Sequence, residues 1–276
     1  MEIRYAIGQQ ETKMMDTASL RAHYLIDSLM VPNKLTLTYT HYDRMIVGGA
    51  APVDEIVDLT NPAELKANYF LERREMGVIN VGGSGFIIAG EKKIELHKLD
   101  GLYIGKGTEK VQFGSLDKHN PPLFYILSAP AHHSYDTILC TAANAVPVTL
   151  GSQQSSNKRT IYKYIHQQGI QSCQLVMGLT ILEEGSVWNS MPPHTHSRRM
   201  EVYFYFDVPD TARVMHFMGS PEETRHIVVA NNEAVLSPPW STHFGCGTMN
   251  YGFIWGMAGE NLAYTDMDPI TMDVLK

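Results

Sequence analysis

The residues of this chain best suited to hold a metal ion are two histidines one residue apart, followed shortly by a glutamate. They are His194, His196 and Glu201. Side chains alternate across an extended segment, so the two histidines point to the same face. Residues 201–206 are aromatic-rich and β-prone, which predicts a strand that begins with the glutamate. After a turn at 198–200, the three side chains would meet across a hairpin around one metal ion.

A fourth ligand is available further along the chain in His243, which follows the turn residues Pro238 and Pro239. An isolated His-x-His pair usually consists of two surface or hydrogen-bonded histidines. The nearby glutamate and the later Pro-flanked histidine, all on strand-like segments, favour a metal site instead. The order and spacing match the ligand pattern of the cupin superfamily, whose members hold a metal in the mouth of a small antiparallel β-barrel.

The expected ligand set therefore combines three neutral imidazoles with one carboxylate. Such a set suits Zn²⁺, Mn²⁺, Fe²⁺ or Ni²⁺, and the ligand types alone do not choose among these ions. The coordination sphere can leave positions open to water or to the oxygens of a substrate. Both a catalytic and a structural role for the metal stay open.

Two tyrosines are candidates for a catalytic role beside the metal. Tyr203 and Tyr205 share the strand parity of Glu201, so their hydroxyls are expected in the same cavity. The alternative, which we weigh equally, is that both are aromatic residues lining a barrel. The base that moves a proton is not identified, and a metal-bound hydroxide or a tyrosine are the two possibilities.

Three basic residues are candidates for binding an anionic substrate. Arg225 begins or enters an expected strand of the metal-bearing half and could hold a carboxylate bidentately. The commoner fate of such an arginine is a salt bridge at the rim, here with Glu222 or Glu223. Arg199 and Lys163 are the next candidates for the same role.

The composition is that of a globular protein, with 276 residues, 44% hydrophobic and 18% charged. The net charge is −7 and there is no basic block, so we expect neither nucleic acid nor an anionic membrane as partner. The cysteines Cys140, Cys173 and Cys246 are odd in number and form no Cys-x-x-Cys pattern, which suits a reducing compartment. No signal core or membrane-spanning run is present, so the expected location is the cytoplasm.

Most of the chain has the pattern of strands joined by short turns. One helix is expected over 17–26, capped by Asp16 or Thr17. After it, alternating segments such as 34–40 and glycine turns such as 82–85 indicate strands.

A faint internal repeat is visible, since 73–76 echoes 198–201. We therefore expect an all-β fold, a tandem cupin of two antiparallel β-barrels or jelly rolls with a short N-terminal helix. The expected domains are 1–128, a helix and a barrel without metal ligands, 129–172, a connection between barrels, and 173–276, the metal-binding barrel with a C-terminal surface arm. In the first barrel Lys110 is expected at the place of the last histidine.

Five segments resemble the family of 5-keto-4-deoxyuronate isomerases, which are 4-deoxy-L-threo-5-hexosulose-uronate ketol-isomerases of pectin breakdown. The segments are Tyr-Phe-Leu-Glu-Arg-Arg-Glu-Met-Gly-Val-Ile-Asn at 69–80, Tyr-Ile-Gly-Lys-Gly at 103–107, Pro-His-Thr-His at 193–196, Arg-Arg-Met-Glu-Val-Tyr-Phe-Tyr-Phe at 198–206 and Glu-Thr-Arg-His-Ile-Val at 223–228. The similarity covers nearly the whole chain. The resemblance implies zinc ligands at His194, His196, Glu201 and His243, with no departure at any of the four, and a homohexamer.

The reaction implied by the resemblance turns 5-dehydro-4-deoxy-D-glucuronate into 3-deoxy-D-glycero-2,5-hexodiulosonate, an aldose–ketose isomerisation of a small anionic sugar acid. A metal suits this intramolecular oxidoreductase chemistry as a Lewis acid, because binding the substrate's oxygens acidifies the intervening C–H. The rival classes are an Fe(II) cupin dioxygenase, which could use the same four ligands, and a non-catalytic sugar-binding or storage cupin. Metal analysis combined with a screen for O₂ uptake would separate the three.

Overall fold

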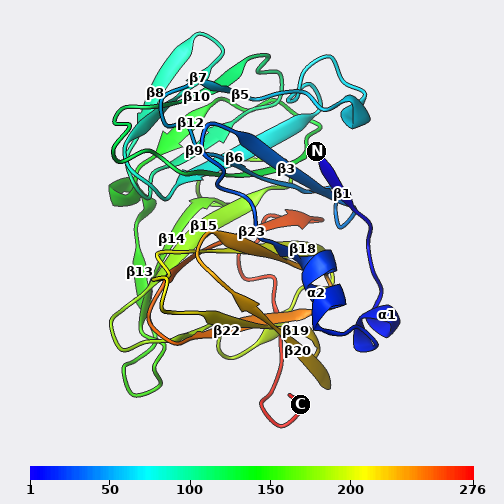
Figure 1. Ribbon diagram of the computed structural model, residues 1–276. Coiled ribbons are helices and arrows are strands. Elements are labelled where there is room, and N and C mark those ends of the chain that lie inside the picture. Colours follow the sequence, from blue (N-terminus) through cyan, green and yellow to red (C-terminus); the bar gives the residue numbers. More distant parts are fainter. The chain divides into compact units, whose positions relative to one another are not determined.

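The computed structural model describes all 276 residues of the chain, most of them in strands or the turns between strands (Figure 1). The chain divides into two compact units. The first comprises Met1–Arg4, Ser28–Val146 and Lys163–Met177, and the second comprises Tyr5–Asp27, Pro147–Tyr162 and Gly178–Lys276. The expectation of a mostly β protein is confirmed.

The first unit is built from two sheets. The larger has the strand order β1-β3-β4-β11-β6-β9-β12, with the bounds Glu2–Arg4, Leu35–Thr40, Ile46–Ala50, Phe124–Pro130, Arg74–Asn80, Gly101–Ile104 and Ile138–Cys140. The smaller has the order β5-β10-β7-β8, with the bounds Val57–Asp58, Val111–Ser115, Gly85–Ala89 and Lys92–Leu96. A short 3₁₀ helix, η1, spans Ala63–Leu65, and another, η2, spans Ala142–Ala145.

The second unit repeats this plan. Its larger sheet has the order β13-β14-β15-β23-β18-β21-β2, with the bounds Val148–Leu150, Arg159–Ile165, Val176–Leu182, Gly252–Gly259, Arg199–Phe206, Glu233–Ser237 and Leu25–Ile26. Residues 163–165 of β14 and 176–177 of β15 fall in the range of the first unit. Its smaller sheet has the order β16-β22-β19-β20, with the bounds Trp188–Asn189, Thr242–Gly247, Val214–Ser220 and Glu223–Val229. A two-stranded pair joins β17, His194–Thr195, to β24, Asp268–Pro269.

The strand orders β4-β11-β6-β9 and β15-β23-β18-β21 correspond one to one, as do those of the two smaller sheets. The faint repeat in the sequence is therefore a real repeat of topology.

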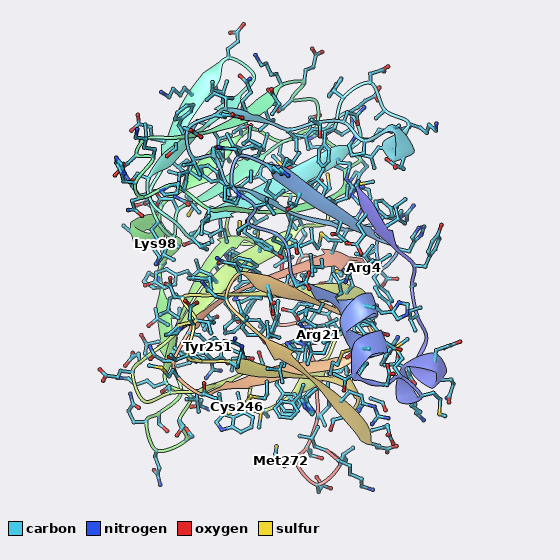
Figure 2. All side chains as sticks on the ribbon, in the orientation of Figure 1. Arg4, Arg21, Lys98, Cys246, Tyr251 and Met272 are labelled. Carbon is cyan, nitrogen blue, oxygen red and sulfur yellow. The ribbon has the colours of Figure 1, made fainter.

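The predicted helix is present and begins where its cap was expected. In α2, Thr17–Tyr24, the Asp16 carboxylate accepts a hydrogen bond of 2.8 Å from the Ser19 backbone N–H. The helix ends two residues earlier than predicted, because 25–26 pairs with β21 as a strand. A further short helix, α1, spans Gln9–Lys13 and was not predicted. Arg21, labelled in Figure 2, fastens α2 to β20 by donating 2.8 Å to the Val228 carbonyl.

The two compact units are not the same as the predicted domains 1–128, 129–172 and 173–276. The boundaries of those domains remain a prediction. The segment predicted as a connection contains three strands, β12, β13 and β14. Its proline, glycine and serine content is typical of a connection, but the alternating run Arg-Thr-Ile-Tyr-Lys-Tyr-Ile within it forms β14. The segment predicted as a linker therefore supplies sheet edges as well as chain connectivity.

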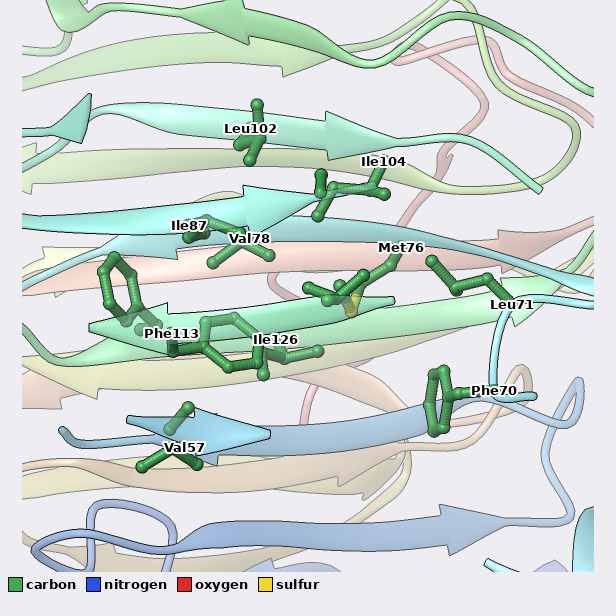
Figure 3. Packing of buried hydrophobic residues seen from close by; sticks show 14 of the residues in the cluster. Val57, Phe70, Leu71, Met76, Val78, Ile87, Leu102, Ile104, Phe113 and Ile126 are labelled. Carbon is green, nitrogen blue, oxygen red and sulfur yellow. The ribbon is translucent and has the colours of Figure 1, made fainter. Parts of the chain in front are cut away.

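The first unit has an apolar core between its sheets. Figure 3 shows members of this cluster, among them Phe70, Leu71, Met76 and Phe113, with their side chains gathered between the strands. All four are at most 2% exposed. Such close packing of aromatic and aliphatic side chains is what stabilises a unit of this size.

The pairing register shows which residue of the first unit takes the place of His243. In β19, Met218 lies two residues before the hairpin that leads to β20, and it pairs with His243. In β7, Ile87 lies two residues before the corresponding hairpin, and it pairs with Phe113. The expectation that Lys110 stands there is wrong, because Lys110 lies in the turn before β10 begins. A buried phenyl ring thus replaces the imidazole.

The glutamate ligand is replaced in the same way. Arg74 begins β6 and Arg199 begins the corresponding strand β18. Two residues on, Met76 in the first unit occupies the position of Glu201 in the second. Neither a phenyl ring nor a buried thioether among aliphatic neighbours is a ligand set for a hard divalent cation.

A buried carboxylate links two stretches of the first unit. Glu75 is fully buried and accepts hydrogen bonds from the backbone N–H groups of Cys173 at 2.7 Å, Gln174 at 2.8 Å and Leu175 at 2.9 Å. The Tyr103 hydroxyl donates a fourth, of 2.9 Å.

We predict that Glu75→Ala lowers the free energy of unfolding by about 3–5 kcal/mol, because three buried backbone donors lose their acceptor. Tyr103→Phe removes one donor only and should cost about 1 kcal/mol. Urea denaturation followed by fluorescence would measure both variants. A Glu75→Ala protein as stable as Tyr103→Phe would contradict this account of the network.

Candidate metal centre

The four predicted ligands converge in the second unit. His194 lies in β17, His196 directly after it, Glu201 in β18 and His243 in β22. One ligand atom from each lies within 4.8 Å of all the others. The predicted hairpin partner is wrong, since β17 pairs with β24 and not with β18. The two histidines still face the same way, as strand parity predicted.

The distances between the ligand atoms fit one small cation. His194 Nε2 lies 3.1 Å from both His196 Nε2 and His243 Nε2. Glu201 Oε2 lies 3.0 Å from His196 Nε2 and 2.7 Å from His243 Nε2. Four ligands at zinc–nitrogen bond length around a tetrahedral ion are about 3.3 Å apart. These four distances are slightly shorter than that spacing, as expected of side chains that converge on one small ion.

The hydrogen-bond balance also favours a cation. Three imidazole nitrogens face one another, and a hydrogen bond between two of them needs a proton on one and a lone pair on the other. The three nitrogens therefore cannot all donate, and some lone pairs are left facing one another. Glu201 Oε2 is buried and has no hydrogen-bond partner. An orphaned carboxylate oxygen in a buried site is costly unless a positive charge meets it. The donor set therefore fits a divalent metal ion.

Neighbouring groups orient two of the imidazoles. His196 Nδ1 donates to the Asp266 carbonyl. His243 Nδ1 lies 3.1 Å from Ser237 Oγ and 3.3 Å from the Ser241 carbonyl. A proton held on Nδ1 by these acceptors leaves the Nε2 lone pair free for a metal, which is the usual arrangement in metalloproteins.

The charges of the site are those that a metal requires. Burial, aided by the neighbouring His243, lowers the pKa of His194 to about 3, so this imidazole is neutral at ordinary pH. Burial alone would raise the pKa of Glu201, but His243 and His196 outweigh it and hold the pKa well below its usual range. A neutral His194 imidazole beside an ionised Glu201 carboxylate suits the binding of a cation.

Three of the four ligands, His194, His196 and Glu201, line a cavity of about 370 Å³ in the second unit. Its walls include Phe253, Trp255 and Met257 from β23, and its floor includes the carboxylate of Glu201. A volume of this size lies in the range of small-molecule sites, which combine apolar walls with a few polar groups.

The two candidate tyrosines have different surroundings. Tyr203 lines the cavity, and its hydroxyl lies 2.6 Å from Ser190 Oγ. Tyr205 does not line it, and its hydroxyl lies 2.7 Å from His216 Nδ1 in the buried interior. Burial, together with the charge of Glu201, raises the pKa of Tyr203 well above its usual value. Tyr203 is therefore a neutral phenol, able to donate a hydrogen bond into the cavity.

The candidate cations lie outside the cavity lining. Arg225 forms an ion pair of 2.9 Å with Glu223 and donates to the Lys13 carbonyl. Arg199 is 1% exposed, and its guanidinium donates to groups of the 261–266 segment. Lys163, in β14, is also absent from the lining.

The cation that does line the cavity is Arg159, at the start of β14. It is half-buried, and its Nη1 donates 2.9 Å to the Asn157 carbonyl. No local pattern marks it, because its place in the cavity comes from the pairing of β14 within the sheet.

The C-terminal segment, expected as a surface arm, also contributes to the site. Tyr264, Thr265 and Met267 line the cavity, and β24 pairs with the strand that carries His194. Arg198 holds the segment in place by donating 2.8 Å to Asp266 Oδ1 and 3.1 Å to both carboxylate oxygens of Asp268. The complementary charges were visible in the sequence, but their pairing across such a long separation was not.

The mostly β fold and the buried imidazole–carboxylate cluster define a cupin-like protein with a site for one metal ion. The model of the KduI/IolB family matches residues 28–271, and the chain belongs to this family. The resemblance seen in the sequence is thereby confirmed.

Curated relatives match over their full length. The chain is 53% identical over 276 residues to a protein of Halalkalibacterium halodurans, and 52% identical over 276 residues to one of Caldicellulosiruptor bescii. In both cases the match covers 100% of each chain. Both relatives are named 4-deoxy-L-threo-5-hexosulose-uronate ketol-isomerase.

Among solved structures, an IolB-like protein from Salmonella typhimurium superposes with a TM-score of 0.70 at 13% sequence identity. The match covers 87% of this chain and 94% of that one. At this identity the likeness concerns the fold alone. In addition, the helices of the chain are too short or too polar for any of them to span a membrane.

We predict that wild-type protein retains about one metal ion per chain, and that His196→Ala and His243→Ala lose most of it, because the ligands act as a set. His226→Ala is the matched control, since His226 is an exposed histidine of the same unit. Elemental analysis of the purified proteins measures the content. Full occupancy in either ligand variant, or two ions per wild-type chain, would refute the assignment.

Proposed function

We propose that this protein is a metal-dependent ketol-isomerase that converts 5-dehydro-4-deoxy-D-glucuronate, also called 4-deoxy-L-threo-5-hexosulose uronate, into 3-deoxy-D-glycero-2,5-hexodiulosonate in polyuronate breakdown. The observation that carries the proposal is the full-length similarity to relatives that bear this name. The cavity with its ligand cluster supports it, since a sugar acid is small enough for about 370 Å³.

We propose zinc as the metal, held by His194, His196, Glu201 and His243. When bound there, a divalent cation would supply Lewis acidity to the oxygens of an aldehyde and its neighbouring hydroxyl. The side chains of the protein would bind the substrate, orient it and position the proton that moves.

Substrate orientation is assigned to Arg159. The substrate carries a carboxylate and the protein as a whole is acidic, so a cation inside the cavity must offset the repulsion. Arg159 lines the cavity, whereas the guanidinium of Arg225 is engaged by Glu223 outside it. A guanidinium can hold a carboxylate through two parallel hydrogen bonds, which would fix the far end of the sugar acid.

A hydrogen-bond donor for the reacting end is available in Tyr203. Its phenol is kept neutral by burial, and it lies beside Ser190 on the same cavity wall. We assign to it the donation of a hydrogen bond to a substrate oxygen on which negative charge develops as a proton shifts between adjacent carbons. The apolar wall of Phe253, Trp255 and Met257 excludes water, which strengthens such a bond.

We further propose that the two sheets of each unit close into a cupin barrel, and that the protein is a cytoplasmic homohexamer. Exposed apolar side chains support self-association, with Ile138 and Leu139 on the edge strand β12 and Val148 on the edge strand β13. The three cysteines are all free, as suits a reducing compartment.

The same ligand set suits Fe²⁺, which makes an O₂-dependent dioxygenase the second candidate function. Incubation of purified protein with an unsaturated-uronate digest, followed by NMR, tests the proposal directly. The aldehyde signal should be replaced by that of the ketose without O₂ uptake. Oxygen consumption with an iron-loaded sample, and no isomerised product, would establish the dioxygenase instead.

We predict that Arg159→Gln reduces kcat/KM by tens to thousands of fold, which corresponds to about 2–5 kcal/mol for a lost charged partner of a desolvated carboxylate. Arg225→Gln is the matched control and should change kcat/KM less than threefold, because exposed ion pairs contribute about 0–1 kcal/mol. Steady-state kinetics and metal analysis would be run on both. A normal Arg159→Gln enzyme, or a strongly impaired Arg225→Gln enzyme with normal metal content, would reverse the assignment.

A further inference from the structure

The first unit has a cavity of its own, which is larger than that of the metal centre. Its volume is about 590 Å³. The charged side chains in its lining are the cations Arg44, Lys66, Arg73 and Arg74 and a single carboxylate, Glu64. The protein as a whole carries a net charge of −7, whereas the side chains of this cavity carry mostly positive charge.

The most telling residue of this lining is Arg74, which is 7% exposed. Its Nε donates 3.1 Å to Ser128 Oγ, and its Nη2 donates 2.7 Å to the Ser128 carbonyl and 2.6 Å to the Arg44 carbonyl. All of these acceptors are neutral. Burial lowers the pKa of Arg74 to about 10, so the guanidinium remains charged at neutral pH.

The neighbouring carboxylate of Glu75 favours the charged form of Arg74 but forms no ion pair with it. Glu75 points to the other face of β6, where backbone N–H groups of 173–175 occupy its oxygens. A buried guanidinium without an anionic partner is energetically costly. The Arg74 guanidinium therefore has no carboxylate in direct contact, and an anion bound in the cavity would supply one.

The corresponding arginine of the second unit shows how such a position is completed. Arg199 lies at the same place on its strand, and the carboxylates of Glu201 and Asp266 favour its charged form. The chain segment 261–266 covers it. In the first unit the cavity lies against Arg74 instead, so the missing anion has room to come from outside the protein.

The remaining lining indicates the body of the ligand. The Arg74 guanidinium lies 6.0 Å from the centre of the Tyr39 ring, and Tyr39 and Phe70 both line the cavity. Ile3 and Leu65 add aliphatic surface. Aromatic and aliphatic walls beside a cluster of arginines suit a molecule that has a C–H face and a carboxylate at one end.

We propose that this cavity is a second ligand site, which binds a monosaccharide acid with its carboxylate on the Arg44, Arg73 and Arg74 cluster and its ring against Tyr39 and Phe70. The site contains no set of metal ligands and is not a second catalytic centre. The first unit would therefore bind the same class of compound, a sugar acid, that the proposed reaction consumes in the second unit.

Amide hydrogen exchange of the intact, metal-loaded protein tests the proposal, with D-glucuronate, D-glucose and inorganic phosphate as probes. Glucuronate should slow exchange in peptides covering 39–46 and 63–74, and glucose and phosphate should not. Peptides covering 190–206 report the metal centre separately, so failure there leaves this result interpretable. An absence of protection at 39–46 and 63–74, or protection by phosphate in place of glucuronate, would overturn the proposal.

The double variant Arg44→Gln/Arg73→Gln locates the effect, because both side chains are exposed and their loss leaves the core intact. It should require about tenfold to a hundredfold more glucuronate for the same protection, with turnover at the metal centre unchanged. Arg213→Gln is the matched control, since Arg213 is an exposed arginine of the second unit that also donates to carbonyls. Wild-type protection in the double variant would refute the site.

Discussion

The second unit depends on the convergence of three imidazole nitrogens and one carboxylate oxygen in a buried space. The lone pairs of these atoms point to a common centre, so the atoms repel one another when no cation is present. The buried carboxylate oxygen of Glu201 also lacks a hydrogen-bond partner. The surrounding strands hold them there against that repulsion. β18 is buried along its whole length between β21 and β23, which leaves Glu201 no route to solvent. The stability of the sheet therefore maintains an arrangement that a bound cation would relieve.

The first unit shows what the same topology becomes without that requirement. Phe113 and Met76 stand where His243 and Glu201 stand in the second unit, and both join the apolar core. Replacing ligands by hydrophobic side chains removes the need for a metal and stabilises the interior by burial alone. The strand orders are the same, so the fold tolerates either kind of centre. Function in this architecture follows from the side chains at a few register positions.

The local part of the site could be predicted from the sequence, and the long-range part could not. His194, His196 and Glu201 are close in sequence, and strand parity predicts that the two histidines face the same way. Glu201 meets them although β17 pairs with β24 and not with β18. The role of Arg159 depends on which strands flank β14, and the register that places Phe113 in line with His243 depends on hairpins far from either residue. Patterns of type and spacing carry no information about such pairings.

One hydrogen bond gives the C-terminal segment a second property. The carbonyl of Asp266 belongs to the segment that walls the cavity, and it is also the acceptor that orients His196. Displacing the segment to widen the entrance would remove this acceptor and free the imidazole to rotate. The affinities of the site for a metal and for a substrate that contacts this segment would then be linked, each changing the other by the same factor. A substrate that holds the segment closed would slow metal exchange, and a loaded metal would favour the closed wall.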